Sequence, residues 1–587
     1  MKIKLYALFT ALAFLPFILP AQSLDWKSKI SATGDPLGVP FAEFKATAVG
    51  PDGRIYSTGY FCGFRAQIGN TIMKADSLGF VQYMLQTPNP PQIPASIFVT
   101  CHEANGSVAW AHTITSKQGY RSEEISNFGK SWISGNKLSF DAQGNILFAG
   151  FIFGDTLSYS GVPFEFQSNP TAPGTGLPRL VVAKISTSGS LVWGHSHAGT
   201  VGLPLYAREI RYFDNTIEVM TNGLTTQTAS WSVLRYSDSG TLLSNPIYQA
   251  QFPGASTGWL YNTLRFSDGR YLTSFLLTVP LGGDMTTVIT LLNPDFSTIS
   301  HHKIKLIEAT QGFTGLTFPQ SASILPDGQI GLFLGLDLSS GYPDWKLILD
   351  EDTLDMNGLS LSTSVMSTPQ GTIFVRLSDP GCMKNVKSFD FISYGENTTS
   401  ANGNFVVLNV KDYPEVGGDT TLKLRQLDRN GNILNTVQLG NLGASFVNND
   451  EGPGNSRHSL APMSGGVAGT FGSWLFKASL PDPVVADQSF SGCLSNRNLL
   501  LANEETLRPD PVARVFESQP GNWEIHGLPA NGARYQLMSA QGKTLLSGSS
   551  TTETARFKTA SLPVGMYYLH INDEKGLSQT LRVVTMH

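Results

Sequence analysis

A short β-hairpin pattern recurs along most of this 587-residue chain. In its first form an apolar, β-rich run is interrupted by a tight turn and then resumes, as in residues 46–60 (ATAVGPDGRIYSTGY) and 264–272 (LRFSDGRYL). Glycine and asparagine tolerate the positive φ that such turns require, and the turn twist suits a hairpin. No amphipathic helical pattern of convincing length lies between the copies, so the recurrence predicts a repeated all-β fold.

A second hairpin form alternates with the first. Residues 97–110 (IFVTCHEANGSVAW) and 180–193 (LVVAKISTSGSLVW) alternate apolar and polar positions on both sides of the turn, with Trp110 and Trp193 in the same place. That period is typical of half-buried strands. Two hairpins make a four-stranded sheet, and sheets in series that bury their faces against their neighbours form a β-propeller.

The number of turns predicts the number of blades. First-form turns are expected near Asp52, Gln143, Asp214, Asp268, Asp327, Asn402 and Ser464. Second-form turns or strands are expected near Asn105, Ser188, Asp238, Asn293, Glu351, Asn430 and Ser491. Pairing them predicts a β-propeller of about seven four-stranded blades. Six or eight blades stay open, because Pro369-Gln370-Gly371 has the form of a further first-form turn without a partner.

The two clearest second-form copies follow the pattern hydrophobic-x-hydrophobic-x-x-D/N-x-x-G-x-x-x-W. In this they resemble a bacterial β-propeller repeat family, and the resemblance extends over roughly Leu24 to Leu500. It implies an exported propeller. It implies no particular chemistry, because one fold can carry many functions.

The sequence changes character after Leu501. A polar stretch, Asn503–Leu507, precedes a segment of small-domain length. Strands are expected at Tyr535–Met538, Lys543–Leu546 and Thr580–Val584, with Leu537, Leu562, Tyr567 and Leu569 as core candidates. The segment therefore predicts a small, separate β-sandwich.

Three motifs in this segment, Pro509-Asp510-Pro511, Met538–Gly542 and Leu562–Leu569, resemble the type A C-terminal sorting domain of the type IX secretion system of Bacteroidetes. Asp510 replaces the usual Asn, and the chain ends in Val-Thr-Met-His rather than a Lys-rich run. The resemblance implies an Ig-like sandwich that the secretion machinery recognises. An ordinary Ig-like accessory sandwich is the alternative.

The first residues have the form of a signal peptide. Lys2 and Lys4 precede an apolar run, Leu5–Leu19, and Ala21 offers a small residue for cleavage. No later segment is long and apolar enough for a membrane span. The expected organisation is a signal peptide at 1–21, a β-propeller at 22–500, a linker at 501–508 and a sorting sandwich at 509–587. The mature protein is then secreted or held at the outer-membrane surface.

Composition narrows the choice of partners. The net charge is −5 and there is no long basic run, which argues against nucleic acid because phosphate binding needs a positive face. An exported chain permits disulfides, and Cys62, Cys101, Cys382 and Cys493 allow three pairings, with buried free thiols or one opportunistic bridge as the alternative.

No candidate for chemistry is convincing at this level. Gly254-Ala255-Ser256-Thr257-Gly258 matches the nucleophile pattern G-x-S-x-G, but strand-like rather than helical sequence follows it. His195 and His197 would share a strand face, as two metal ligands could, yet no third ligand is apparent and we expect loop histidines exposed to solvent. The adjacent pair His301-His302 would point to opposite faces.

An acidic group, Asp350, Glu351, Asp352 and Asp355, lacks the glycine and the spacing of a calcium loop and is expected to be a polar turn. The motifs H-E-x-x-H, C-x-x-C and G-x-x-x-x-G-K-S/T are missing. We therefore assign no catalytic, cofactor-binding or metal-ligating residue and expect no cofactor. The favoured hypothesis is a non-enzymatic surface or secreted module that binds a glycan or a protein through propeller loops. The alternatives are a polysaccharide hydrolase or lyase and a structural component of the cell surface.

Overall fold

The structure is a computed structural model. It describes residues 23–33, 41–75, 95–116, 137–153, 157–166, 178–198, 205–224, 229–250, 257–278, 285–308, 314–337, 345–349, 352–355, 370–379, 382–389, 391–393, 395–409, 411–412, 422–440, 458–485, 514–519, 522–526, 528, 533–539, 543–552, 554–558, 562, 565–573 and 578–585. Every regular element in these ranges is a β-strand, which confirms the all-β class. The same ranges hold no helix that could span a membrane. The expected signal peptide at 1–21 and linker at 501–508 lie outside them.

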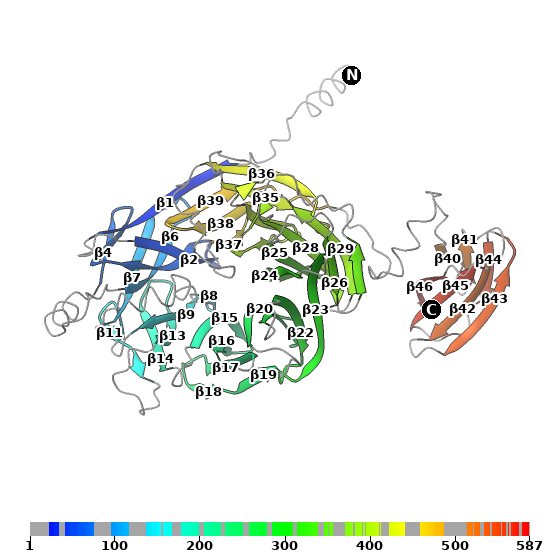
Figure 1. Ribbon diagram of the computed structural model, residues 1–587, viewed down its shortest axis with the longest axis horizontal. Coiled ribbons are helices and arrows are strands. Elements are labelled where there is room, and N and C mark those ends of the chain that lie inside the picture. Colours follow the sequence, from blue (N-terminus) through cyan, green and yellow to red (C-terminus); the bar gives the residue numbers. More distant parts are fainter. Residues whose placement is uncertain are drawn as a thin grey trace, which may run out of the picture. The chain divides into compact units, whose positions relative to one another are not determined.

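The chain divides into two compact units, residues 1–499 and 500–587. In the first unit, antiparallel sheets follow one another around a common centre (Figure 1). The β2 sheet contains β2 (Phe41–Val49), β3 (Ile55–Cys62), β6 (Ala95–His102), β7 (Val108–Ser116), β10 (Leu157–Tyr159) and β11 (Val162–Pro163). The β8 sheet contains β8 (Lys137–Phe140), β9 (Ile146–Phe153), β13 (Pro178–Ile185), β14 (Leu191–Ala198) and β12 (Glu165–Phe166). The β15 sheet contains β15 (Leu205–Phe213), β16 (Thr216–Leu224), β17 (Ala229–Ser237), β18 (Leu242–Ser244) and β19 (Ile247–Ala250).

A ten-stranded sheet comes next along the chain. Its first part contains β20 (Thr257–Arg265), β21 (Tyr271–Thr278), β22 (Met285–Leu292) and β23 (Thr298–Glu308). Its second part contains β24 (Thr314–Ile324), β25 (Ile330–Asp337), β28 (Gln370–Asp379) and β29 (Cys382–Phe389). A hairpin of β26 (Trp345–Leu349) and β27 (Asp352–Asp355) pairs with β23.

The remaining sheets complete the first unit. The β33 sheet contains β32 (Thr398–Thr399), β33 (Phe405–Asn409), β35 (Leu422–Leu427) and β36 (Ile433–Gly440). A two-stranded sheet contains β30 (Phe391–Ile392) and β34 (Lys411–Asp412). The β37 sheet contains β31 (Gly395–Glu396), β37 (His458–Met463), β38 (Gly466–Phe471), β39 (Trp474–Ser479), β1 (Ser23–Thr33), β4 (Arg65–Ile68) and β5 (Thr71–Lys74).

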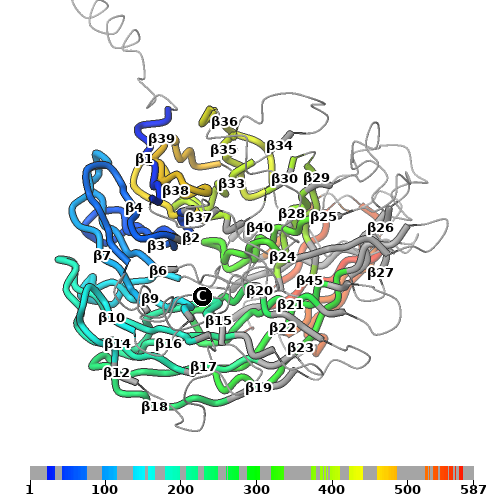
Figure 2. The backbone as a smooth tube through the Cα atoms, turned by 60° about the vertical axis from the view of Figure 1, so that its left-hand side comes forward, coloured from blue at the N-terminus to red at the C-terminus, as the bar shows by residue number. Residues whose placement is uncertain are grey.

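The two ends of the first unit meet in the β37 sheet. The first described strand, β1, pairs antiparallel with β39, so that Leu24 lies opposite Ala478 and Lys27 opposite Phe476 (Figures 1 and 2). At the inner side of the same sheet, β2 contacts both β37 and β38. The last sheet therefore takes its outer strand from the N-terminal end of the chain.

All seven first-form turns close the hairpins expected of them, between β2–β3, β8–β9, β15–β16, β20–β21, β24–β25, β32–β33 and β37–β38. Five second-form turns are likewise confirmed, those near Asn105, Ser188, Asp238, Asn293 and Asn430. The turn at Glu351 is misassigned, because the hairpin that closes there is an addition to β23. Gln370-Gly371 is not a turn but the start of β28. Ser491 lies outside the described residues, and β1 supplies the strand that we expected there.

Tryptophans join several of the neighbouring sheets. Trp110 on β7 donates its Nε1–H to the carbonyl oxygen of Thr187, 3.0 Å away in the turn of the next sheet. In that turn Gly189 has φ +88°, and a Cβ built on it would lie 2.9 Å from the Trp110 ring. Only glycine fits a turn that combines a positive φ with so close an approach.

The same contact occurs on both sides of this one. Trp193 donates to Asp238 O at 3.1 Å and covers Gly240, while Trp26 on β1 donates to Ala104 O at 3.0 Å and covers Gly106. We call these three contacts the tryptophan junctions. They connect the β37, β2, β8 and β15 sheets in order.

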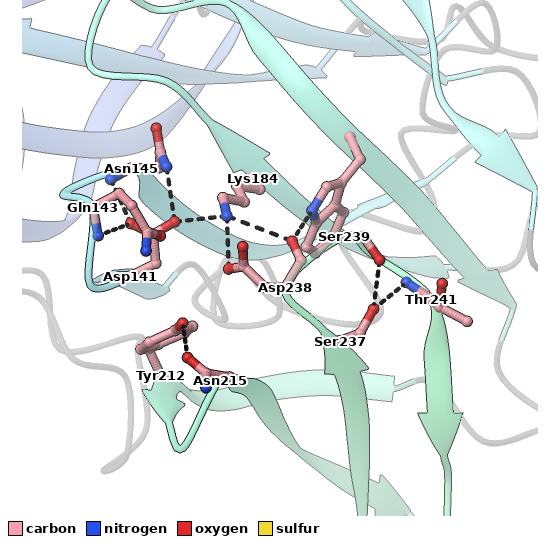
Figure 3. A network of polar contacts seen from close by, with 11 residues as sticks. Asp141, Gln143, Asn145, Lys184, Tyr212, Asn215, Ser237, Asp238, Ser239 and Thr241 are labelled. Carbon is pink, nitrogen blue, oxygen red and sulfur yellow. Dashed lines mark hydrogen bonds and ion pairs between the residues drawn. The ribbon is translucent and has the colours of Figure 1, made fainter.

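A buried cation reinforces the third tryptophan junction. The Lys184 Nζ lies 2.7 Å from Asp141 Oδ2 in its own sheet and 2.7 Å from Asp238 Oδ1 in the next (Figure 3). Burial alone would lower the pKa of Lys184, but the two carboxylates raise it. The ammonium group is therefore held charged between two turns.

The later sheets are joined by arginines instead. Glu218 on β16 is buried and accepts bonds from Arg235 Nε at 3.0 Å, from Arg265 Nη1 at 3.1 Å and from the Tyr271 hydroxyl at 2.9 Å. Arg265 and Tyr271 belong to the ten-stranded sheet, so the carboxylate bridges two sheets. This contact, and the one that follows, are the arginine junctions.

The second arginine junction centres on Arg376 of β28, which is 1% exposed. Its guanidinium bonds Asp327 Oδ2 at 2.9 Å and Gln329 Oε1 at 2.7 Å in its own sheet, and Asn430 Oδ1 at 2.8 Å in the β33 sheet. A planar group with five donors can serve several acceptors at once, which a lysine cannot match in geometry.

The second unit has two sheets. One contains β40 (Arg514–Gln519), β41 (Asn522–His526) and β44 (Thr554–Lys558); the other contains β43 (Thr544–Ser550), β42 (Ala533–Ser539), β45 (Gly565–Asp573) and β46 (Ser578–Thr585). Both contribute to one core, which includes the expected Leu537, Tyr567 and Leu569, with Leu562 packed against it. The core is formed entirely by residues of this unit.

The cysteines behave differently from one another. Cys101 is a buried free thiol beside Tyr56, and burial raises its pKa to about 11. Cys382 is disulfide-bonded. The side chain of Cys62 and all of Cys493 lie outside the described residues. A free Cys101 rules out all three of the two-disulfide pairings and leaves the single bridge of Cys382.

Candidate functional site

The expected histidine positions are strand residues, and the expectation of solvent-exposed loop histidines is wrong for the first pair. His195 and His197 lie on β14 and are only 5% and 6% exposed. Both contact the Tyr236 ring of the next sheet, and the Tyr236 hydroxyl is hydrogen-bonded to His197 Nε2. Burial lowers the pKa of His197 to about 4, so the imidazole is neutral and packs as part of the junction.

The other sequence candidates do not assemble into a site. His301 and His302 alternate on β23, as expected, with His301 exposed. Ser256 lies outside the described residues, and β20, not a helix, follows it. Asp352 and Asp355 are on β27, and their side chains lie outside the description. No group of three possible metal ligands occurs in the described ranges.

The structure draws attention to a different place, the inner strands nearest the centre of the first unit. β2, β8, β15, β20 and β24 lie around this centre, and each contacts the next (Figure 1). Four of them carry a β-bulge. The extra residues are Lys45, Arg208, Tyr261 and Gln320. Bulges re-aim side chains and are frequent beside functional sites, and here a bulge recurs in four of the five inner strands.

Charged residues gather on the inner strands of the β2, β8 and β15 sheets. We call Glu43, Lys45, Lys137, Arg208 and Glu209 the charged cluster. Lys45 is buried, with its Nζ 2.9 Å from Glu43 Oε2 and 5.1 Å from the centre of the Tyr60 ring. The Tyr60 hydroxyl donates to the same carboxylate oxygen at 2.9 Å.

Lys137 occupies the middle of this cluster. Burial lowers the pKa of Lys137 to about 8, Glu209 opposes that shift, and Arg208 adds to it. The amine of Lys137 therefore interacts with one acid and one further cation, both on β15.

Neutral polar groups gather on the inner strands of the ten-stranded sheet. We call Asn262, Thr263, Ser274, Gln320 and Ser321 the amide–hydroxyl cluster. Gln320 is 8% exposed, and neither its amide nitrogen nor its amide oxygen has a hydrogen-bond partner in the described structure. Thr263 Oγ1, Ser321 Oγ, Ser274 Oγ and Asn262 Nδ2 are likewise without a partner there.

So many unsatisfied groups on contacting strands need an explanation. A buried polar atom left without a partner costs about 1–3 kcal/mol, and natural folds satisfy nearly all of them. Strands β20 and β24 contact each other, and Ser274 lies opposite Asn262. Ordered water or the hydroxyl groups of a ligand would supply the missing partners.

Sequence reasoning missed both clusters. Their residues lie on six strands between Glu43 and Ser321, and no linear motif joins them. One signal was available. Lys45, Tyr261 and Gln320 each lie four residues before the last paired residue of their strand, and a polar or bulky residue at that point of a first-form copy marks the bulge.

Comparison with known proteins adds no functional assignment. No protein-family model matches the chain, and no curated protein matches it. Similar solved structures include a protein of unknown function from Dyadobacter fermentans (10% identity, TM-score 0.36, 78% of this chain and 99% of that one). They also include the polysaccharide lyase Uly1 (8%, 0.39, 75% and 90%) and the exotype rhamnogalacturonan lyase YesX (11%, 0.35, 79% and 76%).

Proposed function

We propose that the protein is an exported, non-enzymatic binding module whose first unit is a seven-bladed β-propeller that binds a glycan at its centre. The seven first-form hairpins support the number of blades, since each supplies an inner strand and its neighbour. The pairing of β1 with β39 supports a ring closed by both chain ends. The ten-stranded sheet counts as two blades, because β23 and β24 share only two paired positions.

The observation that carries the binding function is the amide–hydroxyl cluster. Sugars are recognised by amide and hydroxyl groups that exchange hydrogen bonds with ring hydroxyls, and such groups gain most where they are already desolvated. Four buried side chains and the half-buried Asn262, with unused donors or acceptors on the contacting strands β20, β21 and β24, match that requirement.

The test is a binding screen of the full mature chain against a panel of polysaccharides, followed by calorimetry on each hit. Replacing Gln320 by Leu keeps the size of the side chain and removes both hydrogen-bonding atoms, so we expect a loss of affinity of about tenfold or more. Gln329→Leu is the matched control, since Gln329 bonds Arg376 in an arginine junction. If no glycan binds, or if both variants bind the glycan with the affinity of the wild type, the proposal is wrong and water alone satisfies the amide–hydroxyl cluster.

We further propose that the second unit is an Ig-like sorting module of the type IX system and that the protein is secreted or displayed on the outer membrane. The sequence resemblance motivates this, and the self-contained core of the unit supports its separability. Deleting residues 508–587 should leave a folded first unit in the periplasm, and fusing them to another exported protein should carry it outside. If the truncated chain were exported normally, the sorting proposal would be wrong and the alternative, an accessory sandwich, would be favoured.

One observation favours a second function, eliminative cleavage of an acidic polysaccharide. A lyase needs a base to remove a proton and a cation to neutralise the neighbouring carboxylate, and Lys137 and Arg208 offer that pair of groups. Hydrolysis lacks comparable support, because Glu43 is engaged by Lys45 and Tyr60. Incubation with polyuronates, monitored by the ultraviolet absorbance of unsaturated products, decides between binding and cleavage.

A further inference from the structure

Within the amide–hydroxyl cluster, Gln320 is the residue whose side-chain amide is open at both ends. It is 8% exposed, and neither Nε2 nor Oε1 has a hydrogen-bond partner in the described structure. Gln426 on β35 is also buried, yet its Oε1 accepts a hydrogen bond from Asn435 Nδ2 at 2.6 Å. Because buried amides are satisfied almost everywhere in natural folds, the open amide of Gln320 requires a partner from water or from a ligand.

The β-bulge of β24 sets the position of this amide. Gln320 is the extra residue between Pro319 and Ser321, each of which is paired with a residue of β25. The extra residue of a bulge has no neighbour opposite it in the ladder, and the bulge re-aims its side chain. β24 also contacts β20 and β21, which carry the three cluster residues outside β24. The open amide therefore lies on strands that hold further open polar groups.

The shape of a carboxamide restricts what can satisfy both of its ends. The group presents donors on Nε2 beside an acceptor on Oε1 in one plane. It is best matched by a partner with an acceptor next to a donor, which is how glutamine and asparagine bind an adenine edge at two points. Two free hydroxyl groups on neighbouring carbons of a sugar ring provide such a pair. One hydroxyl oxygen accepts from Nε2 of Gln320, and the other hydroxyl donates to Oε1.

The other open groups of the cluster favour hydroxyl partners over a peptide. Thr263, Ser274 and Ser321 are buried hydroxyls without a partner in the described structure, and Asn262 Nδ2 is an unused donor there. A sugar hydroxyl both donates and accepts, so it can serve each of these groups in any order. A peptide N–H only donates and a peptide C=O only accepts, so a peptide would have to match each group separately.

We infer that the central site recognises a vicinal diol, meaning two free hydroxyl groups on neighbouring ring carbons of a sugar, which Gln320 binds with both ends of its amide. This rests on the proposed glycan-binding function and adds the part of the sugar that is recognised. The linkage of the glycan then decides binding, because a linkage through the middle hydroxyl of a ring leaves no neighbouring pair.

The experiment compares glycans of one sugar that differ only in linkage, with the full mature chain. The probes are long soluble glucans, galactans and mannans, each linked through O4 or through O3. Internal rings linked through O4 keep the free pair at O2 and O3, whereas internal rings linked through O3 keep no neighbouring pair. We expect at least one O4-linked glycan to bind about tenfold or more tightly than its O3-linked counterpart, since the second form leaves the amide without its paired hydrogen bonds.

Two variants separate the diol from the remaining hydroxyls. Gln320→Leu should lower the affinity for the O4-linked glycan to that for the O3-linked form and leave the latter unchanged. Ser274→Ala is the matched control, because it removes one buried hydroxyl of the same cluster and should weaken both forms by the same factor. Thermal melts confirm that each variant is folded, and Gln320→Met replaces Gln320→Leu if that variant does not fold.

The outcomes distinguish this inference from the function on which it rests. Equal binding of O4-linked and O3-linked glycans would overturn recognition of a diol and keep glycan binding. A preference for the O4-linked form that survives Gln320→Leu would also overturn it, because the preference would then come from the shape of the glycan. No binding to any glycan, or binding only to peptides of a random library in the same screen, would overturn the function itself.

Discussion

The tryptophan junctions and the arginine junctions perform the same task with different chemistry. In the first, an indole ring covers a glycine turn and donates one hydrogen bond to it, as Trp110 and Trp193 do. In the second, a buried charge such as Glu218 or Arg376 joins side chains of two sheets. An apolar ring tolerates the loss of its single hydrogen bond, whereas a buried charge that loses its partner strongly destabilises the fold.

At the boundary between the two kinds of junction, both partners of a tryptophan junction are replaced, the tryptophan and the glycine of the turn that it covers. Trp110 and Trp193 each lie four residues after the glycine of their own turn. At the corresponding position after Gly240, the chain has Ser244 instead of a tryptophan. In the turn of the following sheet, Phe296 takes the glycine position at φ +66°. Its ring stacks on Tyr271 at 4.6 Å between centroids. With no indole to accommodate, the turn can hold a side chain, and the Glu218 junction connects these sheets instead.

The largest expected effect is at an arginine junction. Glu218→Gln leaves Arg235 and Arg265 facing each other without the carboxylate, and we expect the free energy of unfolding to fall by about 3–5 kcal/mol. Chemical denaturation of the full chain measures it. Hydrogen exchange should rise first in β16, β20 and β21. A loss below about 1 kcal/mol would mean that the ion network contributes as little as a surface pair.

A smaller effect is expected at a tryptophan junction. Gly240→Ala forces a residue at φ +89° and places a Cβ 2.8 Å from the Trp193 ring, for a cost of about 2–3 kcal/mol. Gly465→Ala is the matched control, because that turn has φ +75° and nothing within 4 Å of the added carbon. In the control, the free energy of unfolding should fall only by the cost of placing alanine at a positive φ, about 1–2 kcal/mol. Equal losses would show that the indole contact contributes nothing.

Acid should weaken the tryptophan junctions selectively. Burial lowers the pKa of His102, which stacks on Trp26, and of His197, each to about 4. The unfolded chain then binds the proton more readily, so the stability is complete above pH 6.5 and declines as the pH falls from there towards 4.

The size of the acid effect is about 2 kcal/mol per histidine at pH 5, from the difference between the two pKa values. His197→Asn should flatten the pH dependence of the unfolding midpoint between pH 7 and 5, whatever it does to the midpoint at pH 7. An unchanged slope in this variant would remove His197 as a source of acid sensitivity.

The smallest effect is expected from Trp110→Phe, which keeps an aromatic ring over Gly189 but removes the hydrogen bond from Nε1 to Thr187 O and part of the ring surface. The net worth of one such bond is about 1 kcal/mol. Denaturation at pH 7 measures the loss. A much larger value would show that the indole's extra surface, rather than its hydrogen bond, holds this junction.

The sequence by itself determined the local hairpins. Asp52-Gly53, Asp268-Gly269 and the other turns were found because a two-residue reversal needs positive φ, which is a property of the residues in the turn. Strand alternation and the separate core of the second unit were found for the same reason, since each depends on residues close together in the chain.

Only the tertiary structure decided how the hairpins combine. The pairing of β1 with β39 joins positions 23–29 to 474–479, which no local pattern marks. Whether His197 is exposed depends on Tyr236 in the next sheet. Lys137 and Gln320 lie on inner strands around a common centre because neighbouring sheets pack against one another, and no local pattern marks that packing.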